Sequence, residues 1–179
     1  MIWLSAILVL VVLAGIWAFN RLVRQRNLVS EAWAGIDVQL QRRHELIPNL
    51  VAVARGYLAH EAGVLEQVTL VRGASVDQAP AVAERESGLS RAIGRLFALA
   101  ENYPELKASA NLAQLHDSLV QVEDQLQYAR RYYNGAVRDY NNSVESFPVN
   151  LAAGLFRFRP AAFFEIEFAS QRSAPHVAL

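Results

Sequence analysis

The chain has 179 residues, and its 17 basic and 17 acidic side chains give a formal net charge of zero at pH 7. A balanced charge argues against nucleic-acid binding, which needs a basic surface. The sequence contains no cysteine, which excludes disulfides, thiolate metal sites and a cysteine nucleophile. A chain of this length accommodates one domain besides a membrane anchor.

The first segment is strongly apolar, because residues 2–19 include no charged side chain. As a helix they cover roughly 27 Å, close to the ~30 Å hydrocarbon core of a bilayer. A buried core helix of this kind would need a far larger domain around it. A cleaved signal peptide would show a basic residue before the apolar run and a small-residue cleavage site, and neither is present. The sequence therefore predicts a transmembrane anchor over residues 1–20.

The first charges after this segment are Arg21, Arg24 and Arg26. The positive-inside bias predicts that this flank and the rest of the chain lie in the cytoplasm, with the N-terminus outside. The same arginines lie where anionic lipid headgroups attract basic side chains. We therefore expect a single-pass protein whose membrane flank is formed by these three residues.

Residues 21–148 repeat apolar side chains at helical spacing, which predicts a helical bundle. Pro48 is expected to end a first helix and to open a second that runs to Arg72, since proline fits the first turn of a helix but not its interior. A third helix is expected from Pro80 to Ala100. Short connections favour antiparallel neighbours. The predicted fold is thus all-α: one transmembrane helix followed by an antiparallel up-and-down four-helix bundle with a long last helix.

The last helix is expected to begin after Ser109 as N-cap. Its apolar or aromatic positions follow the three-four spacing of a coiled-coil seam, and they are Leu112, Leu115, Leu119, Val122, Leu126, Ala129, Tyr133, Ala136, Tyr140, Val144 and Phe147. This pattern predicts that Tyr133 and Tyr140 serve packing first.

Residues 149–179 form a tail in which aromatic rings alternate with charged side chains. Its candidate interaction residues are Phe156, Arg157, Phe158, Arg159, Phe163 and Phe164. Such a segment could lie at lipid headgroups with its arginines on phosphate, cover a protein partner, or fold back on the bundle.

Four-helix bundles often hold two metal ions through Glu-x-x-His pairs, but the sequence contains no such pair. His44 and Glu45 are adjacent, as are His60 and Glu61, and neighbours on a helix diverge too far to bind one ion together. Glu61 is expected to form an internal ion pair with an arginine such as Arg43, Arg55 or Arg130, or to stay partly exposed.

No catalytic residue, cofactor, metal or small-molecule substrate is therefore expected. The rival hypothesis is a metal- or carboxylate-dependent enzyme, whose site would use Asp37, Glu45, His60, Glu61 and Glu101.

Three stretches of the sequence together resemble the LemA family. The first runs from Arg26 to Glu61 and includes EAWAGIDVQL at 31–40 and LIPNLV at 46–51; the second is LFALAENYPELK at 96–107; the third begins with ARRYYN at 129–134 and ends at Phe147-Pro148. The resemblance spans nearly everything from Arg21 to Phe168. It departs from the family pattern at Leu112 and His116. It implies a helical bundle protein of a bacterial membrane, here the cytoplasmic (inner) membrane, and it implies no established reaction.

A membrane-tethered bundle without a catalytic constellation suggests a non-enzymatic scaffold or adaptor. Its expected partners are the lipid bilayer and either other membrane proteins or copies of itself as a homo-oligomer. The alternative within the same class is a self-assembling component that organises a membrane or envelope.

Overall fold

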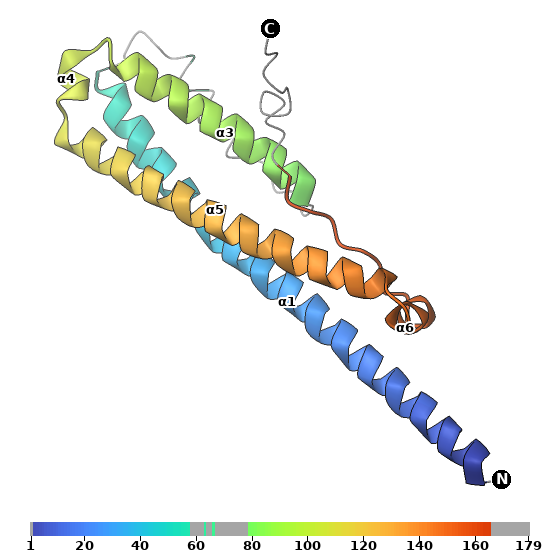
Figure 1. The fold of residues 1–179 in the computed structure, drawn as a ribbon. Coiled ribbons are helices and arrows are strands. Elements are labelled where there is room, and N and C mark those ends of the chain that lie inside the picture. Colours follow the sequence, from blue (N-terminus) through green and yellow to red (C-terminus); the bar gives the residue numbers. More distant parts are fainter. Residues whose placement is uncertain (1, 58–62, 64–65, 67–78, 166–179) are drawn as a thin grey trace, which may run out of the picture. The chain divides into compact units, whose positions relative to one another are not determined.

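The computed structural model describes residues 2–57, 63, 66 and 79–165. Every regular element within these residues is a helix, which confirms the all-α prediction. The helices are α1 Ile2–Arg55, α3 Ala79–Ala100, α4 Pro104–Lys107, α5 Ala110–Glu145 and α6 Val149–Leu155 (Figure 1). The chain divides into two compact units: the first contains Met1–Gln41 and Glu123–Phe163, and the second contains Arg42–Val122 and Phe164–Leu179.

Helix α1 differs from the prediction at Pro48, which lies inside the helix rather than at its end. A proline in a helix interior removes one backbone hydrogen bond and costs about 3 kcal/mol. The helix continues because Leu50 and Ala54 beyond the proline are fully buried in the same core as Ile47 before it. Burying side chains such as Leu50 and Val51 returns ~1.5 to 3 kcal/mol each, which offsets the lost bond.

The second unit packs α1, α3, α4 and the start of α5 around one core. The buried residues are Ile47, Leu50, Val51, Ala54, Leu89, Ala92, Ile93, Leu96, Ala100, Leu106, Leu112 and Leu119. The predicted third helix is confirmed to within one residue, since α3 spans Ala79–Ala100. Ser109 occupies the expected N-cap position, because its carbonyl oxygen accepts the first helical bond of α5 from the Ala113 N–H, 3.1 Å away.

The predicted four-helix bundle is not confirmed. Helix α1 has 54 residues and takes up the first predicted helix together with the beginning of the second. The remainder of that second helix, residues 58–72, lies outside the described residues except at Gly63 and Glu66. The longest helix is therefore the first, because α5 has 36 residues.

Most positions of the seam predicted along α5 are buried, while Leu115 and Ala129 are partly buried. Leu126, Tyr133, Ala136 and Tyr140 are all buried. Phe147 is instead 79% exposed, because α5 ends at Glu145 and the chain turns before α6 begins.

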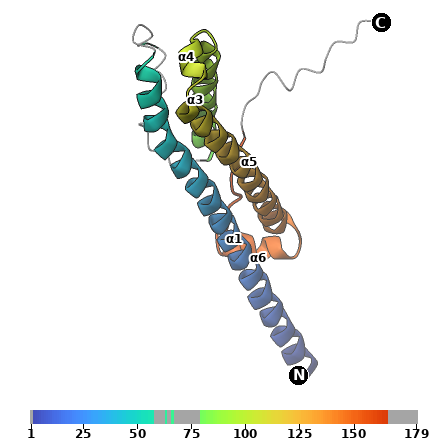
Figure 2. The same ribbon diagram turned by 90° about the vertical axis from the view of Figure 1, so that its left-hand side faces the viewer.

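The first unit has its own core, built where α1, α5 and α6 meet. Ala18 and Leu22 of α1 pack with Tyr140 and Val144 of α5, and α6 adds Val149 and Ala153. Figure 2 shows α6 against α1, and the shared core confirms that the two helices are in contact. The sequence assigned residues 149–155 to the aromatic, arginine-rich tail and predicted no helix there, so the short α6 is a new element.

Candidate membrane-interface site

The N-terminal part of α1 presents apolar side chains to its surroundings. Twelve large apolar residues between Ile2 and Trp17 are 53–84% exposed. The most apolar 18-residue window of the helix has a mean hydropathy of 2.6 and is only 6% buried. By length and composition this helix could therefore cross a membrane, as the sequence predicts.

Helix α6 has two apolar faces. Val149 and Ala153 point into the first-unit core. Leu151 and Leu155, four residues apart and so on one face, are 66% and 76% exposed. Phe147, just before the helix, is exposed as well. An exposed apolar face on a short surface helix is the pattern of a segment that contacts lipid or a protein.

Ring contacts fix α6 at the end of the apolar part of α1. The Phe19 ring lies edge-on to Phe156 at 4.7 Å and to Phe158 at 5.8 Å, measured between ring centroids. Phe19 is the last apolar residue before Asn20 and the first charged residue, Arg21. The exposed face of α6 is thus held next to the point at which α1 changes from apolar to basic.

The three predicted flank arginines are all exposed. The Arg21 guanidinium lies 5.4 Å from the centre of the Trp17 ring, and that of Arg26 lies 5.3 Å from the Phe158 ring. Cations over aromatic faces are attracted by the ring quadrupole. Arg21 and Arg26 are thereby oriented on the protein surface, while their predicted contact with lipid stays a prediction.

The chain reverses direction after α6 and returns along α5. Helix α6 ends in two bonds, from Arg157 N–H to Gly154 O and from Phe158 N–H to Ala153 O. This pattern is a Schellman motif. Arg157 has a φ of 58°, a left-handed conformation that usually calls for glycine. Because the turn residue is an arginine and not a glycine, the sequence did not indicate this reversal.

Three side chains of α5 hold the returning segment. Tyr133 Oη donates to the carbonyl oxygen of Ala162 at 2.9 Å, and Tyr140 Oη donates to that of Arg159 at 3.0 Å. Asn141 makes a two-way contact with Ala161: its Nδ2 donates to the carbonyl oxygen and its Oδ1 accepts from the N–H. The two tyrosines thus combine packing with a specific bond that the seam pattern could not show.

Burial changes the titration of both tyrosines. Loss of solvent raises the pKa of the Tyr133 phenol above its ordinary value. It also raises the pKa of Tyr140, where the nearby Arg26 cation opposes the shift. Both phenols are therefore held in the protonated form that can donate a hydrogen bond.

The tail residues have unequal surroundings. Phe158 packs against the first-unit core, and Phe164 is buried. Phe156 and Phe163 are 53% and 38% exposed, and Arg159 is exposed. The sequence left three interpretations of the tail open. Folding back on the protein accounts for Phe158 and Phe164, whereas the exposed rings of Phe156 and Phe163 stay available to lipid or a partner.

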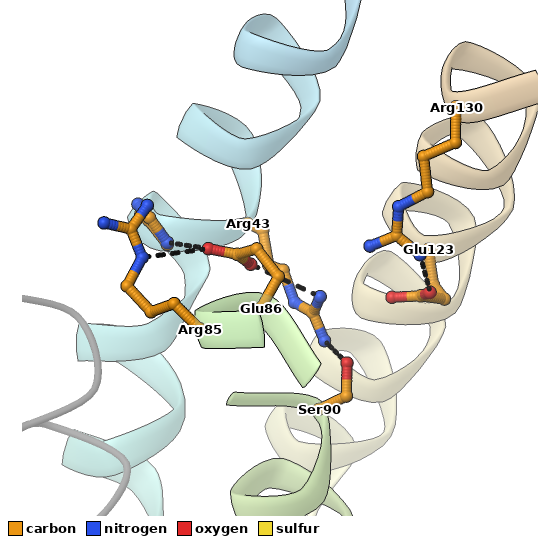
Figure 3. Close-up of polar contacts among 7 residues, drawn as sticks. Arg43, Arg85, Glu86, Ser90, Glu123 and Arg130 are labelled. Atoms are coloured by element: carbon orange, nitrogen blue, oxygen red, sulfur yellow. Dashed lines mark hydrogen bonds and ion pairs between the residues drawn. The ribbon is translucent and has the colours of Figure 1, made fainter. Parts of the chain in front are cut away.

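A buried carboxylate occupies the second unit. Glu86 of α3 is fully buried, with its Oε1 at 3.1 Å from His44 Nε2 and its Oε2 at 3.6 Å from Arg43 Nη1 (Figure 3). Arg85 Nε lies 3.7 Å from Oε1. Arg43 also donates to Ser90 Oγ at 2.8 Å. This arrangement pairs a buried acid with buried and half-buried basic groups, as burial of charge requires.

Sequence reasoning missed Glu86, although a signal was present. Val82, Glu86, Leu89 and Ile93 follow the four-three-four spacing of the α3 stripe, so the glutamate occupies a core position. Arg43 likewise falls between Leu40 and Ile47 on α1. A charged residue on each of two apolar stripes predicts that the two charges meet inside the fold.

Three of the five residues of the rival enzyme hypothesis lie among the described residues. Asp37, Glu45 and Glu101 are exposed, and His60 and Glu61 lie outside the described residues. Across the part of the chain that the structure describes, no three His, Asp or Glu side chains are grouped to hold a metal ion. Of the arginines suggested as partners of Glu61, Arg43 faces Glu86 and Arg130 lies 3.5 Å from Glu123.

Comparison with known proteins gives one family and a small set of relatives. A family model described as the LemA family matches residues 32–179. The chain is 25% identical over 175 residues to magnetosome proteins MamQ 1 and MamQ 2 of Paramagnetospirillum magneticum, covering 82% of this chain and 64% of each relative. It is 27% identical over 150 residues to Protein LemA of Metamycoplasma hominis, covering 82% of this chain and 68% of that protein. The chain thus spans less than two thirds of the length of the MamQ relatives.

Proposed function

The chain belongs to the LemA family, and from this premise we propose that it is a membrane-anchored, cytoplasm-facing helical scaffold or adaptor that does not catalyse a reaction. The observation that carries the proposal is the continuity of α1. The same unbroken helix bears the exposed apolar segment up to Trp17 and then the buried core residues Ala18 and Leu22. A folded unit built directly on a membrane-spanning helix is held at a fixed depth and has its remaining surface free for partners.

The exposed face of α6 supports the same function. Leu151 and Leu155 lie on a helix that contacts Phe19 through Phe156. With α1 in the bilayer, these leucines face the lipid boundary and give the first unit a second contact with the membrane. Two contacts restrict the tilt of the unit relative to the membrane, which suits a platform for other proteins.

The proposed orientation follows from the arginine flank, with the N-terminus outside and both units in the cytoplasm of a bacterial inner membrane. Its test is cysteine labelling of spheroplasts, for which this cysteine-free chain is well suited. A membrane-impermeant maleimide is expected to label Ile2→Cys on intact spheroplasts, and to label Asn150→Cys only after permeabilisation. The reverse pattern would mean the opposite topology.

The scaffold role is tested by the mass and composition of the complex extracted in mild detergent. A stoichiometric second protein supports the adaptor. A heavy species of this chain alone supports the second candidate, a self-assembling membrane-organising or envelope component. That candidate is favoured by Tyr128 and Tyr132, which leave 63% and 56% of their surface exposed on one face of α5. A monomer without partners contradicts both.

The enzyme hypothesis makes a separate prediction. Stoichiometric iron, manganese or zinc in the purified protein, lost on Glu61→Ala, would favour it over the scaffold. The MamQ relatives are named as magnetosome proteins, and we propose no magnetosome role for this chain.

A further inference from the structure

A pocket of about 370 Å³ opens in the first unit, between α1, α5 and the turn that leads into α6. Helix α1 contributes Trp17, Arg21 and Gln25 to its wall, and α5 contributes Asp139 and Asn142. The turn adds Phe147. The wall therefore combines a cation, a carboxylate and two amides with two aromatic rings, and the function proposed above assigns no role to this space.

Asp139 supplies the acceptor of the pocket. Gln25 Nε2 donates to the backbone carbonyl oxygen of Asp139 at 3.3 Å, which holds this residue against α1. The Asp139 carboxylate is 64% exposed and lies 3.6 Å from Arg138. It can therefore accept hydrogen bonds from a donor-rich, positively charged group.

The opposite charge is supplied by Arg21. Its guanidinium lies over Trp17, so it is oriented, and it carries donors suited to a phosphate. A cation and a carboxylate among the residues that line one pocket complement a ligand that has a phosphate and an ammonium group a few bonds apart.

The location of the pocket identifies the source of such a ligand. Trp17 and Arg21 flank Phe19, where the apolar segment of α1 ends. If α1 spans the bilayer, the pocket lies at the depth of the lipid headgroups, and acyl chains would extend along the exposed apolar surface of α1.

We propose that this pocket binds the headgroup of a phosphoethanolamine lipid, with the phosphate on Arg21 and the ammonium facing the Asp139 carboxylate. This inference rests on the proposed membrane anchorage. It assigns Arg21 a specific ligand, in addition to its part in the basic flank.

The test is native mass spectrometry of the full chain released from micelles that contain equal amounts of phosphatidylethanolamine, phosphatidylglycerol and phosphatidylcholine. One phosphatidylethanolamine is expected to be retained in excess. Charge-assisted hydrogen bonds contribute ~1.5 to 3 kcal/mol, so Arg21→Gln is expected to lower retention roughly tenfold or more. The matched control is Arg24→Gln, an exposed arginine of the same flank that does not line the pocket.

Asp139→Asn tests the ammonium contact separately. Because the Asp139 side chain is mostly exposed, the variant is expected to fold normally by circular dichroism and to lose its preference for phosphatidylethanolamine over phosphatidylglycerol. Equal retention of all three lipids by the wild type would overturn the proposal, as would an equal loss in Arg24→Gln. Displacement by free phosphoethanolamine at the concentration of the lipid would show a site for a soluble phosphoester instead.

Flotation of the wild-type protein with liposomes separates the two proposals. A chain that floats but retains no excess phosphatidylethanolamine disproves the pocket assignment alone. A chain that does not float disproves the membrane anchorage on which the assignment rests.

Discussion

The phenol of Tyr140 donates a hydrogen bond to the backbone carbonyl oxygen of Arg159, 3.0 Å away and nineteen residues later in the chain. Asn141, the next residue, forms hydrogen bonds with both the N–H and the carbonyl oxygen of Ala161. Two consecutive residues of α5 thereby hold the segment that returns from α6, and with it the position of α6 beside α1.

Tyr140→Phe removes the first of these bonds and keeps the ring. The variant is expected to lose about 1 kcal/mol of stability, because the Arg159 carbonyl loses its donor at a partly buried site. Exchange of the amide hydrogens of residues 159 and 161–163 should become faster, while exchange in the core of the second unit is unchanged. Tyr132→Phe, at an exposed position on the same helix, is the control and should leave both measurements unchanged. Equal exchange in the two variants would contradict the role of the bond.

The raised pKa values of Tyr133 and Tyr140 predict a loss of stability at alkaline pH. A group whose pKa is higher in the folded state binds its proton more tightly there, so its contribution is fully present below the unfolded pKa of about 10. The contribution is lost as the pH rises through the folded pKa. Ionised phenols also cannot donate to Ala162 and Arg159. Release of the 159–163 segment should therefore begin above about pH 10.

The measurement is tyrosinate absorbance during an alkaline titration. The chain has six tyrosines, and two are expected to ionise later than the others. In the double variant Tyr133→Phe/Tyr140→Phe the late phase should disappear. A late phase that persists in this variant would assign it to other tyrosines.

Removing the buried carboxylate of Glu86 should lower the free energy of unfolding strongly. Glu86→Ala takes away the counter-charge that faces Arg43 and His44, and breaking one side of a buried ion pair costs ~3 to 5 kcal/mol. Glu84→Ala, two residues earlier and exposed, should change the free energy of unfolding by less than about 0.5 kcal/mol. Chemical denaturation of both variants measures the difference.

A double replacement tests whether the cost comes from uncompensated charge. Glu86→Leu combined with Arg43→Met removes both charges and keeps an apolar volume, so it should be more stable than Glu86→Ala. If the double variant were no more stable than Glu86→Ala, the loss of stability would come from the geometry of the site and not from its charge balance.

Helical periodicity in the sequence is sufficient to predict part of this structure. Periodicity located α3, the beginning of α5 and its buried seam, because each rests on many side chains that share one spacing. The burial of Glu86 and Arg43 could also have been predicted, since both residues occupy core positions on apolar stripes. The stripe gives the positions of charged residues but not their partners, which depend on how helices distant in sequence pack together.

The return of the tail along α5 could not be predicted in the same way. It depends on the left-handed conformation of Arg157, and an arginine gives no sign of such a turn where a glycine would. Phe158, which contacts Phe19, comes directly after that turn. The candidate residues of the tail were identified by composition, whereas their division into buried and exposed members required the fold.

Single cysteines on α6 test its contact with lipid. An environment-sensitive dye attached at Leu151→Cys or Leu155→Cys should shift to shorter wavelength when the full chain is moved from detergent-free amphipol into liposomes, because both side chains face the proposed lipid boundary. The dye at Asn150→Cys, also exposed but on a polar residue, should shift less. Equal shifts at all three positions would contradict a defined face, and no shift would remove α6 from the membrane contact.

Pro48 allows a direct test of the difference between the sequence prediction and the structure. In the structure it lies inside α1 and is exposed, so Pro48→Ala restores a backbone hydrogen bond to the carbonyl of His44 without disturbing the core. The gain of up to ~3 kcal/mol is reduced by the greater freedom of the unfolded chain, about 0.4 to 1 kcal/mol, and a net stabilisation of about 2 kcal/mol is expected. Asn49→Ala, at the adjacent exposed position, controls for helix propensity and should add less than ~0.7 kcal/mol. If Pro48 instead opened a separate helix, its replacement would leave stability unchanged or lower it, and denaturation of the two variants distinguishes these outcomes.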